Sequence, residues 1–269
     1  MGHQYYKDDL RAKKSFGQHF LINNQVLQDI LGVITTATDN IETPSILEVG
    51  PGKGALTHLL NTKFNKLIAV EADRDMVEYL VQKQILPQEK IIFQDILKLD
   101  FEDLFQGKPF WIVGNFPYNI SSQIVFKIIE NHEKVQGMVG MFQKEMAERI
   151  CAPHGSKTYG IISVLTQSLY EVELNFHIGP QNFSPPPKVE SSIITLKLKS
   201  DLNIDYPWDV LKKVVKISFG QRRKMLRNTL AGLIDRKEQL EDPIFNKRPE
   251  QLSVEDFITL VKKYFTNHS

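Results

Sequence analysis

The sequence has little of what marks secreted, disulfide-bonded or membrane proteins. Its 269 residues include one cysteine, Cys151, which excludes an internal disulfide framework and a cysteine-rich zinc site. No apolar run approaches the roughly 18 residues that a membrane helix needs, and the polar residues 1–14 contain no apolar segment of a signal peptide. We therefore expect a cytoplasmic protein with no membrane partner, and no obligate protein partner is evident.

A large excess of either charge is also missing, because 33 basic residues face 32 acidic ones and the formal net charge is +1. A nucleic-acid surface must therefore come from local clusters. One cluster, at Arg11, Lys13 and Lys14, lies in a segment without acids, and residues 210–234 hold seven cations and no acid. That pattern is typical of sequence-independent binding to phosphates, although a solvated helix surface is the alternative.

Length and composition indicate one large domain followed by a small one. With 42% apolar residues the chain can build a sizeable core. Residues 200–207 form a polar connector, and everything after it has a helical pattern. We therefore predict a catalytic domain over residues 1–200, with a basic N-terminal arm at 1–24, and a helical RNA-binding domain over residues 201–269.

Short apolar runs alternate with helical patterns through the first half of the chain. Strands are predicted at 46–50, 67–70, 91–93, 110–114 and 135–142, and later at 172–178 and 192–198; helices are predicted at 26–34, from 55, at 144–150 and at 161–170. This order is typical of an α/β fold with a parallel sheet. Ligands of such sheets bind outside the carboxyl ends of the strands.

Two features at those strand ends suit a nucleoside cofactor. Residues 50–54, Gly-Pro-Gly-Lys-Gly, form a turn whose glycines let the backbone approach a ligand. Glu71 ends the next strand, where a carboxylate accepts hydrogen bonds from a ribose diol. Since the loop also fits the dinucleotide pattern, these residues alone leave an NAD-dependent oxidoreductase open.

Residues 115–118, Asn-Phe-Pro-Tyr, follow the fourth strand and offer a different chemistry. Methylation of an exocyclic base amine needs acceptors for its protons and an aromatic face for its ring. The Asn115 side chain, the Phe116 carbonyl and the Tyr118 ring supply that set. The alternative is a strand end closed by a proline turn. Phe183 precedes three prolines that make a stiff segment, and it is either a second aromatic face or a core residue.

Four segments together resemble one family. Residues 48–54 resemble the first motif of S-adenosylmethionine-dependent methyltransferases, and residues 115–118 resemble their adenine-N6 motif. Residues 183–191 and 219–228 resemble segments special to rRNA adenine dimethyltransferases of the KsgA/RsmA type. The match runs from about Phe16 to the final helix, so it covers nearly the whole chain.

The resemblance implies a Rossmann-like class I methyltransferase sheet with a small all-α C-terminal domain. It implies transfer of methyl groups from S-adenosylmethionine, without a metal, to N6 of two adjacent adenosines in the 3′-terminal hairpin of 16S rRNA. Its partner is then 16S rRNA in the immature 30S subunit, during small-subunit biogenesis. Open alternatives are a resistance-type methyltransferase of 23S rRNA, a DNA adenine methyltransferase and a non-catalytic ribosome assembly factor.

The resemblance also implies the site residues. The predicted cofactor contacts are His19, Leu21, Gly50, Gly52, Glu71, Asp95 and Asn115. The predicted catalytic residues are Asn115, Phe116, Pro117, Tyr118 and Phe183. The predicted RNA contacts are Arg11, Lys13, Lys14, Lys188, Arg222, Arg223, Lys224 and Arg227. Glu71 is expected on the ribose hydroxyls and Asp95 on the cofactor's adenine amine. Members of the family commonly have Asn at the position of His19, where a histidine nitrogen would have to donate the corresponding bond.

Overall fold

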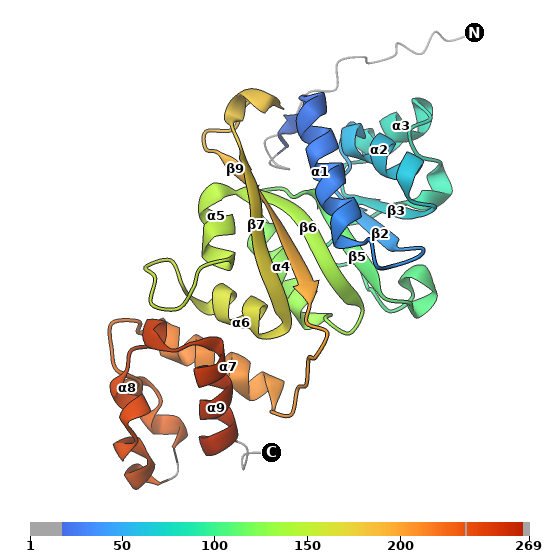
Figure 1. The fold of residues 1–269 in the computed structure, drawn as a ribbon. Coiled ribbons are helices and arrows are strands. Elements are labelled where there is room, and N and C mark those ends of the chain that lie inside the picture. Colours follow the sequence, from blue (N-terminus) through green and yellow to red (C-terminus); the bar gives the residue numbers. More distant parts are fainter. Residues whose placement is uncertain (1–17, 235, 266–269) are drawn as a thin grey trace, which may run out of the picture. The chain divides into compact units, whose positions relative to one another are not determined.

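The centre of the fold is a seven-stranded sheet, in a computed structural model that describes residues 18–234 and 236–265 (Figure 1). The strands lie in the order β4-β3-β2-β5-β6-β9-β7. Their bounds are β2 (Ser45–Val49), β3 (Lys66–Glu71), β4 (Ile91–Phe93), β5 (Phe110–Asn115), β6 (Val135–Gln143), β7 (Tyr170–Ile178) and β9 (Ser191–Leu198). The α/β fold predicted from the alternation of apolar runs is confirmed.

The strands β2 to β6 pair in parallel. β3 and β5 flank β2, β4 pairs with β3, and β6 pairs with β5. Every residue of β2 is buried, which explains why apolar and polar residues do not alternate along it, since a strand covered on both faces has no reason to alternate. The chain moves outward from β2 to β3 and β4 and then returns to β5, so the switch point lies between β2 and β5. Open α/β sheets bind ligands at such a point.

Helices cover both faces of these strands (Figure 1). α1 (Asn24–Ala37), α2 (Ala55–Lys63) and α3 (Arg74–Gln82) join one buried cluster with alternate strand residues such as Ile46 and Trp111. α4 (Ser121–Glu130) buries four apolar side chains on the other face. Asn23 caps α1 and Asp73 caps α3, each accepting backbone N–H groups of the first turn. These caps fix where the helices begin, just after the loops that form the site.

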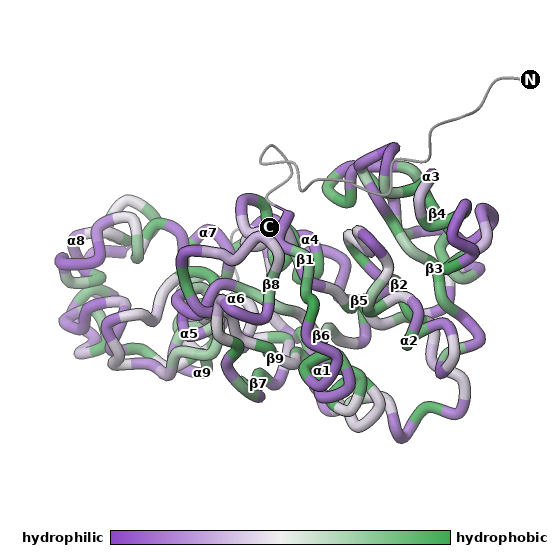
Figure 2. The backbone as a smooth tube through the Cα atoms, turned by 90° about the horizontal axis from the view of Figure 1, so that it is seen from above, coloured by the Kyte–Doolittle hydropathy of each residue, from purple (hydrophilic) through white to green (hydrophobic). Residues whose placement is uncertain are grey.

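A short antiparallel pair of strands stands apart from the main sheet. β1 (Phe20–Leu21) pairs with β8 (Phe183–Ser184), with Leu21 opposite Phe183. Figure 2 shows these two segments side by side although more than 150 residues separate them in the chain. Each strand is two residues long, so no periodic pattern in the sequence predicts either of them. The pair brings the residues before α1 onto the site.

The chain divides into two compact units. Unit 1 holds the residues up to Lys144 and Asn175–Thr195, and unit 2 holds Glu145–Leu174 and the residues from Leu196 onward. The helices of unit 2 are α5 (Lys144–Ile150), apart from its first residue, α6 (Ile161–Leu169), α7 (Trp208–Gly220), α8 (Leu226–Thr229) and α9 (Val254–Tyr264). Its core includes the ring of Phe219 between Tyr159 and Phe257, at centroid distances of 6.0 Å.

The remaining regular structure is a set of short 3₁₀ turns. They lie at Gln88–Lys90, Leu104–Gly107, Pro180–Asn182, Ala231–Leu233, Lys237–Glu241, Pro243–Asn246 and Pro249–Gln251. In the described part of the chain, no helix has both the length and the apolar character needed to span a bilayer.

Gly140 sets how closely β6 packs on the residue that follows β5. A Cβ at Gly140 would stand 2.3 Å from the Phe116 ring and 2.9 Å from the Phe142 ring. We predict that Gly140→Ala lowers the free energy of unfolding by about 1–3 kcal/mol, the usual cost of overpacking. Urea unfolding followed by circular dichroism measures this.

Gly32 is the matched control. It lies within α1, and a Cβ there would meet nothing within 4 Å. Gly32→Ala should therefore raise the free energy of unfolding by about 0.5–1 kcal/mol, because alanine is the better helix residue. Equal effects of the two substitutions would contradict the packing described for Phe116.

Candidate active site

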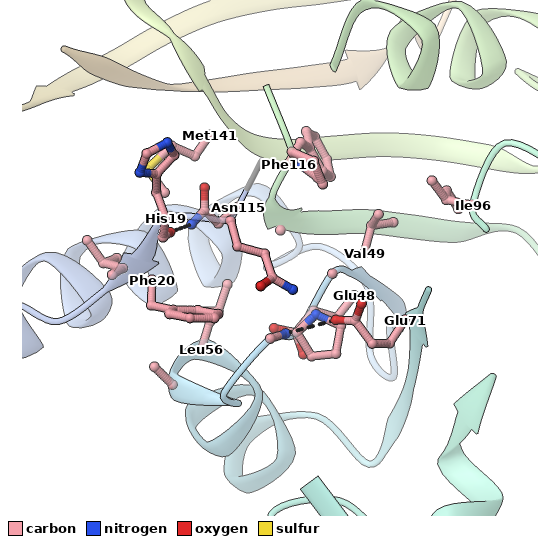
Figure 3. Close-up of a pocket in the computed structure, with 18 of the residues that line it drawn as sticks. His19, Phe20, Glu48, Val49, Leu56, Glu71, Ile96, Asn115, Phe116 and Met141 are labelled. Carbon is pink, nitrogen blue, oxygen red and sulfur yellow. Dashed lines mark hydrogen bonds between the residues drawn. The ribbon is translucent and has the colours of Figure 1, made fainter. Parts of the chain in front are cut away.

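Unit 1 contains a cavity of about 450 Å³ at the carboxyl ends of the parallel strands. Its wall is formed by residues 18–22, the loop after β2 and the ends of β3, β4 and β5 (Figure 3). The volume is in the range of small-molecule sites. The structure thus brings together the predicted residues His19, Leu21, Gly50, Gly52, Glu71, Asp95, Asn115, Phe116, Pro117 and Tyr118.

Gly52 lets the loop after β2 fold under the segment before α1. Its φ of +52° lies in the left-handed region, and a Cβ would stand 2.9 Å from the Phe20 ring. Its N–H donates to Glu71 Oε2 at 3.1 Å. The Lys53 ammonium lies over the same Phe20 ring, 5.2 Å from its centroid. A glycine is therefore required here for both conformation and space.

Two carboxylates after neighbouring strands are held in place by backbone amides. Glu71 accepts from Gly52 N and, at 2.9 Å, from Asp73 N. Burial raises the pKa of Glu71, while these N–H donors lower it. Asp95, after β4, accepts from Leu97 N at 2.9 Å. Each side chain reaches the cavity with a fixed orientation, as acceptors for hydroxyl and amine donors require.

Asn115 ends β5 with its amide oriented by a hydrogen bond. Its Nδ2 donates to the His19 carbonyl at 2.8 Å (Figure 3). Because a carbonyl only accepts, this contact fixes which amide atom is the donor and leaves Oδ1 as an acceptor. The Phe116 ring turns away into the core, where it is 1% exposed and packs edge-on against Phe142. The backbone of the motif is thereby anchored while its polar atoms stay at the cavity.

Tyr118 carries an aromatic face at the same place. Its hydroxyl and Ser191 Oγ are 2.6 Å apart, and burial raises the pKa of the phenol. The His19 ring stacks on it, with ring centroids 5.5 Å apart and planes 25° apart. One face of the Tyr118 ring is thus already stacked with another planar ring, that of His19.

His19 Nδ1 lies 2.9 Å from the Pro185 carbonyl oxygen. The carbonyl can only accept, so Nδ1 carries the hydrogen. In the neutral ring Nε2 is then an acceptor, not the donor that an asparagine amide would supply. The structure places His19 at the cavity but makes the expected donated bond unavailable to the neutral ring.

Phe183 lies elsewhere. Its side chain is 2% exposed and belongs to the core cluster with Leu21 and Ile193. It does not belong to the cavity wall. The sequence left a core role and an aromatic-face role open, and in this structure the ring occupies the core position because β1 and β8 pair over it. Its role as a second stacking face stays a prediction.

The predicted RNA contacts differ in how free their charges are. Lys188, Arg223, Lys224 and Arg227 are exposed. Arg222 donates to the carbonyls of Lys157 (2.6 Å) and Ser156 (3.1 Å), and its Nε lies 3.9 Å from Glu250. Its guanidinium therefore holds a loop of unit 2 in place. Arg11, Lys13 and Lys14 lie outside the described residues.

Sequence reasoning missed several cavity residues. Gln18, Phe20 and Ile22 reach it through the pairing of β1 with β8, and Met141 through its place on β6. Glu48 also lies in the cavity wall, and its sequence signal is an acid inside an otherwise apolar strand. Its side chain is 2% exposed, and its Oε2 has no hydrogen-bond partner among the described residues.

The fold and the site define a class. A Gly loop at the switch point, a ribose-type carboxylate after the next strand and an oriented Asn-x-Pro-Tyr edge are the parts of a Rossmann-like S-adenosylmethionine-dependent methyltransferase that acts on an exocyclic amine. The model of the family described as ribosomal RNA adenine dimethylase matches residues 9–266. The chain belongs to this ribosomal RNA adenine dimethylase family, and it is an S-adenosylmethionine-dependent rRNA adenine dimethyltransferase.

Relatives and solved structures agree with this assignment. The chain is 46% identical over 255 residues to the ribosomal RNA small subunit methyltransferase A of Bacteroides thetaiotaomicron, covering 94% of each protein. It is 44% identical to that of Flavobacterium johnsoniae, covering 95% of this chain and 97% of the relative. A dimethyladenosine transferase from Plasmodium falciparum matches with a TM-score of 0.76 and 26% identity, over 91% of this chain and 97% of that one. The 23S rRNA methyltransferase ErmE, at 21% identity and a TM-score of 0.66, shares the fold.

The cavity fits this cofactor. S-Adenosylmethionine carries a ribose diol, an adenine amine and two cationic centres. Glu71 and Asp95 offer oriented acceptors to the hydroxyl and amine donors of such a molecule. Among the described residues no group of three His, Cys, Asp or Glu side chains is arranged to hold a metal ion.

The buried Glu48 gives a prediction about pH. Desolvation raises its pKa from 4.5 to about 8, and the nearby Glu71 carboxylate adds to the rise. Between these values the native state keeps a proton that the unfolded state releases, so the free energy of unfolding falls as pH rises from about 5 to 8. Glu48→Gln removes this loss. Between pH 5 and pH 8, the free energy of unfolding of the variant should rise relative to that of the wild type by more than about 1.4 kcal/mol, since a shift of one pKa unit corresponds to that amount.

Urea unfolding of both proteins at pH 5 and pH 8, without ligand, measures the difference. Other titrating groups are common to the two proteins and cancel. A difference between variant and wild type that stays constant with pH would contradict a proton on Glu48 in the native state.

Proposed function

We propose that the protein dimethylates N6 of two adjacent adenosines in the 3′-terminal hairpin of 16S rRNA, acting on the immature 30S subunit during small-subunit biogenesis in the cytoplasm. The observation that carries the catalytic part is the orientation of Asn115, whose Oδ1 is left as an acceptor at the cavity. The choice of the small subunit rests on the printed names of relatives that are 44–46% identical over nearly the whole chain.

Cofactor binding in this proposal uses the strand ends as a cradle. Glu71 takes the ribose hydroxyls and Asp95 takes the adenine amine. The loop at Gly50 and Gly52 allows close approach of the backbone, and Leu21 and His19 close the cavity from the side of β1. When bound, S-adenosylmethionine supplies an electrophilic methyl group on its sulfonium.

The adenine amine is placed by residues 115–118. The N6 lone pair is delocalised into the ring, so N6 is a poor nucleophile. Asn115 Oδ1 and the Phe116 carbonyl oxygen accept its two N–H bonds, which favours a pyramidal nitrogen whose lone pair faces the methyl carbon. Catalysis is then mostly positioning. Pro117 turns the Phe116 carbonyl outward, and the Phe116 ring buried on Gly140 holds it there.

Tyr118 provides the stacking surface for the flipped base. Stacking on an aromatic side chain is worth roughly 1–3 kcal/mol per base, against a few kcal/mol for flipping. A second face from Phe183 would lower the cost further but requires its ring to leave the core cluster. In the second transfer one N6 proton remains, so one of the two acceptors is enough to orient the monomethylated amine.

The RNA surface of the proposal comes from exposed cations. Arg223, Lys224 and Arg227 are exposed and form no ion pair with any described residue, whereas Lys212 pairs with Asp209 at 2.7 Å. Lys188 is exposed beside the 185–187 prolines. We do not count Arg222 among the main RNA contacts, because its guanidinium already donates hydrogen bonds to backbone carbonyls. We retain the division of roles between a catalytic part, residues 1–200, and an RNA-binding part, residues 201–269.

Two alternative functions differ from the proposed one in what the protein methylates, or in whether it methylates at all. A resistance-type enzyme would methylate 23S rRNA, and the likeness to ErmE is one of fold. A non-catalytic assembly factor would bind small-subunit particles without consuming the cofactor. Labelled S-adenosylmethionine with immature 30S particles, 50S precursors and DNA distinguishes them. We expect N6,N6-dimethyladenosine in 16S rRNA only; label in 23S rRNA or none at all would overturn the proposal.

The catalytic role of Asn115 predicts the behaviour of two variants. Asn115→Ala removes the acceptor and should lower kcat at least about 100-fold, the scale of losing one oriented transition-state contact, while RNA binding persists. Asn115→Asp keeps an oxygen acceptor but cannot donate to the His19 carbonyl, so it should also lose most activity. Methyl incorporation into immature 30S particles and filter binding of the RNA measure the two effects. Asn61→Ala, at an exposed position of α2, is the control. A wild-type kcat in Asn115→Ala would refute the role.

The exposed cations predict a change in salt dependence. Arg223→Ala/Lys224→Ala should weaken RNA binding and lower the slope of log affinity against log salt by about 1.4–1.8, at 0.7–0.9 per lost phosphate contact. The pair Lys63→Ala/Lys108→Ala removes the same charge from exposed sites of unit 1. An equal fall of the slope in that control pair would mean that the RNA surface lies elsewhere.

A further inference from the structure

The His19 ring is stacked on Tyr118, the residue that provides the stacking surface for the target base in the proposed function. The two ring centroids are 5.5 Å apart and the ring planes differ by 25°. Both side chains are half-buried, and both belong to the wall of the cavity. Figure 3 shows the His19 ring on the Met141 side of Asn115, away from Glu71. The structure thus places a pair of aromatic rings at the end of β5.

Each ring of this pair is held by a hydrogen bond of its own. The Tyr118 hydroxyl and Ser191 Oγ are 2.6 Å apart, and His19 Nδ1 lies 2.9 Å from the Pro185 carbonyl oxygen. The pairing of β1 with β8 explains the second contact, because one step beyond the last pair of its register His19 stands opposite Pro185. Two segments that are distant in the sequence therefore bring the imidazole to Tyr118.

Phe183, the ring predicted to cover the second face of the base, is less available than His19. Its side chain is 2% exposed, packs in the core cluster and lies outside the cavity wall. Its backbone is fixed by pairing with Leu21 of β1. Moving this ring to the base would empty a core position, and the resulting cavity would cost stability. The His19 ring needs no such rearrangement, because it already lies at the site.

The hydrogen bond of His19 also weakens its predicted role as a polar contact of the cofactor. Since Nδ1 carries the hydrogen that the Pro185 carbonyl accepts, Nε2 of the neutral ring can only accept. An asparagine, which is common at this position in the family, offers a donor but no aromatic face. The histidine offers the face and lacks the donor, so its chemistry suits a base better than the cofactor.

We propose that His19 is the second aromatic face for the target adenine, which is held between the His19 and Tyr118 rings. Two stacked contacts of about 3.5 Å each place the outer rings about 7 Å apart, and the present centroid distance is 5.5 Å. A displacement of the His19 ring by about 1.5 Å therefore admits the base. This movement is a rotation of the side chain, so the His19 carbonyl keeps its bond from Asn115 Nδ2. The inference rests on the proposed function and adds to it a residue that contacts the base.

The contribution of the target base to binding can be measured by itself. Two forms of small-subunit particle are reconstituted with unmethylated 16S rRNA, one with the two target adenosines and one with abasic residues in their place. Filter binding of the full-length protein without S-adenosylmethionine gives a Kd for each form. The ratio of the two values, abasic over adenosine, reports the base alone, because contacts to the RNA backbone and the stability of the protein are common to both measurements.

Three substitutions at position 19 separate an aromatic face from a polar contact. His19→Ala and His19→Asn remove the face, so each should lower the ratio about 5- to 150-fold, the range for one aromatic stack on a base. His19→Phe keeps the face without the ring nitrogens and should keep most of the ratio. Tyr118→Ala removes the other face and should lower the ratio as well. A Kd for the abasic particles equal to that of the wild type shows that a variant is folded.

Two results with these variants would overturn the inference. A loss in His19→Phe as large as that in His19→Ala would show that the aromatic face is not what matters. A ratio that rises in His19→Ala would show that the imidazole obstructs the base instead of holding it.

The wild type distinguishes failure of this inference from failure of the proposed function. Equal affinity of the wild type for the two particles would mean that no base enters the site, which removes the proposed function together with the inference. A wild-type ratio well above one that persists in His19→Ala and His19→Asn would leave the function intact and remove only the role of His19.

Discussion

The hydrogen bond from Asn115 Nδ2 to the His19 carbonyl is the contact on which the geometry of the site depends. It joins the end of β5 to the segment before α1, 96 residues away, and so closes one wall of the cavity. It also decides the orientation of the amide, because the carbonyl accepts only from Nδ2. The position of Oδ1, which we propose accepts an adenine N–H, is thus set in the absence of substrate. Preorganisation of this kind is what positioning catalysis requires.

Much of the fold follows from local sequence. The runs that form β2, β3, β4, β5 and β6 are apolar because both faces of those strands are covered, and their spacing with helices dictates a parallel sheet. Parallel strands collect their carboxyl ends at one edge, so Gly50, Glu71 and Asn115 could be placed together from the sequence alone. The same reasoning separated residues after 201 as helical.

The rest depends on contacts between distant residues that no local pattern encodes. β1 and β8 are each two residues long and form because each supplies the other's hydrogen bonds. Their pairing buries Phe183. From the sequence, this ring could equally be a core residue or a stacking face for the base. In the sequence Arg222 cannot be told from its exposed neighbours, yet its guanidinium donates hydrogen bonds to the backbone carbonyls of residues 156 and 157. His19 resembles a replacement for an asparagine donor until the Pro185 carbonyl fixes its hydrogen on Nδ1.

The central claim is that residues 115–118 hold the adenine amine in line with the methyl group of the cofactor. The most direct measurement is a crystal structure of the protein with a bisubstrate analogue in which adenosine N6 is joined to the cofactor through the carbon that stands for the methyl group. We predict that N6 lies between Asn115 Oδ1 and the Phe116 carbonyl oxygen, with the adenine ring on Tyr118 and the cofactor ribose on Glu71. An adenine bound away from residues 115–118, or an Asn115 amide turned to present Nδ2 to it, would contradict this arrangement of the site.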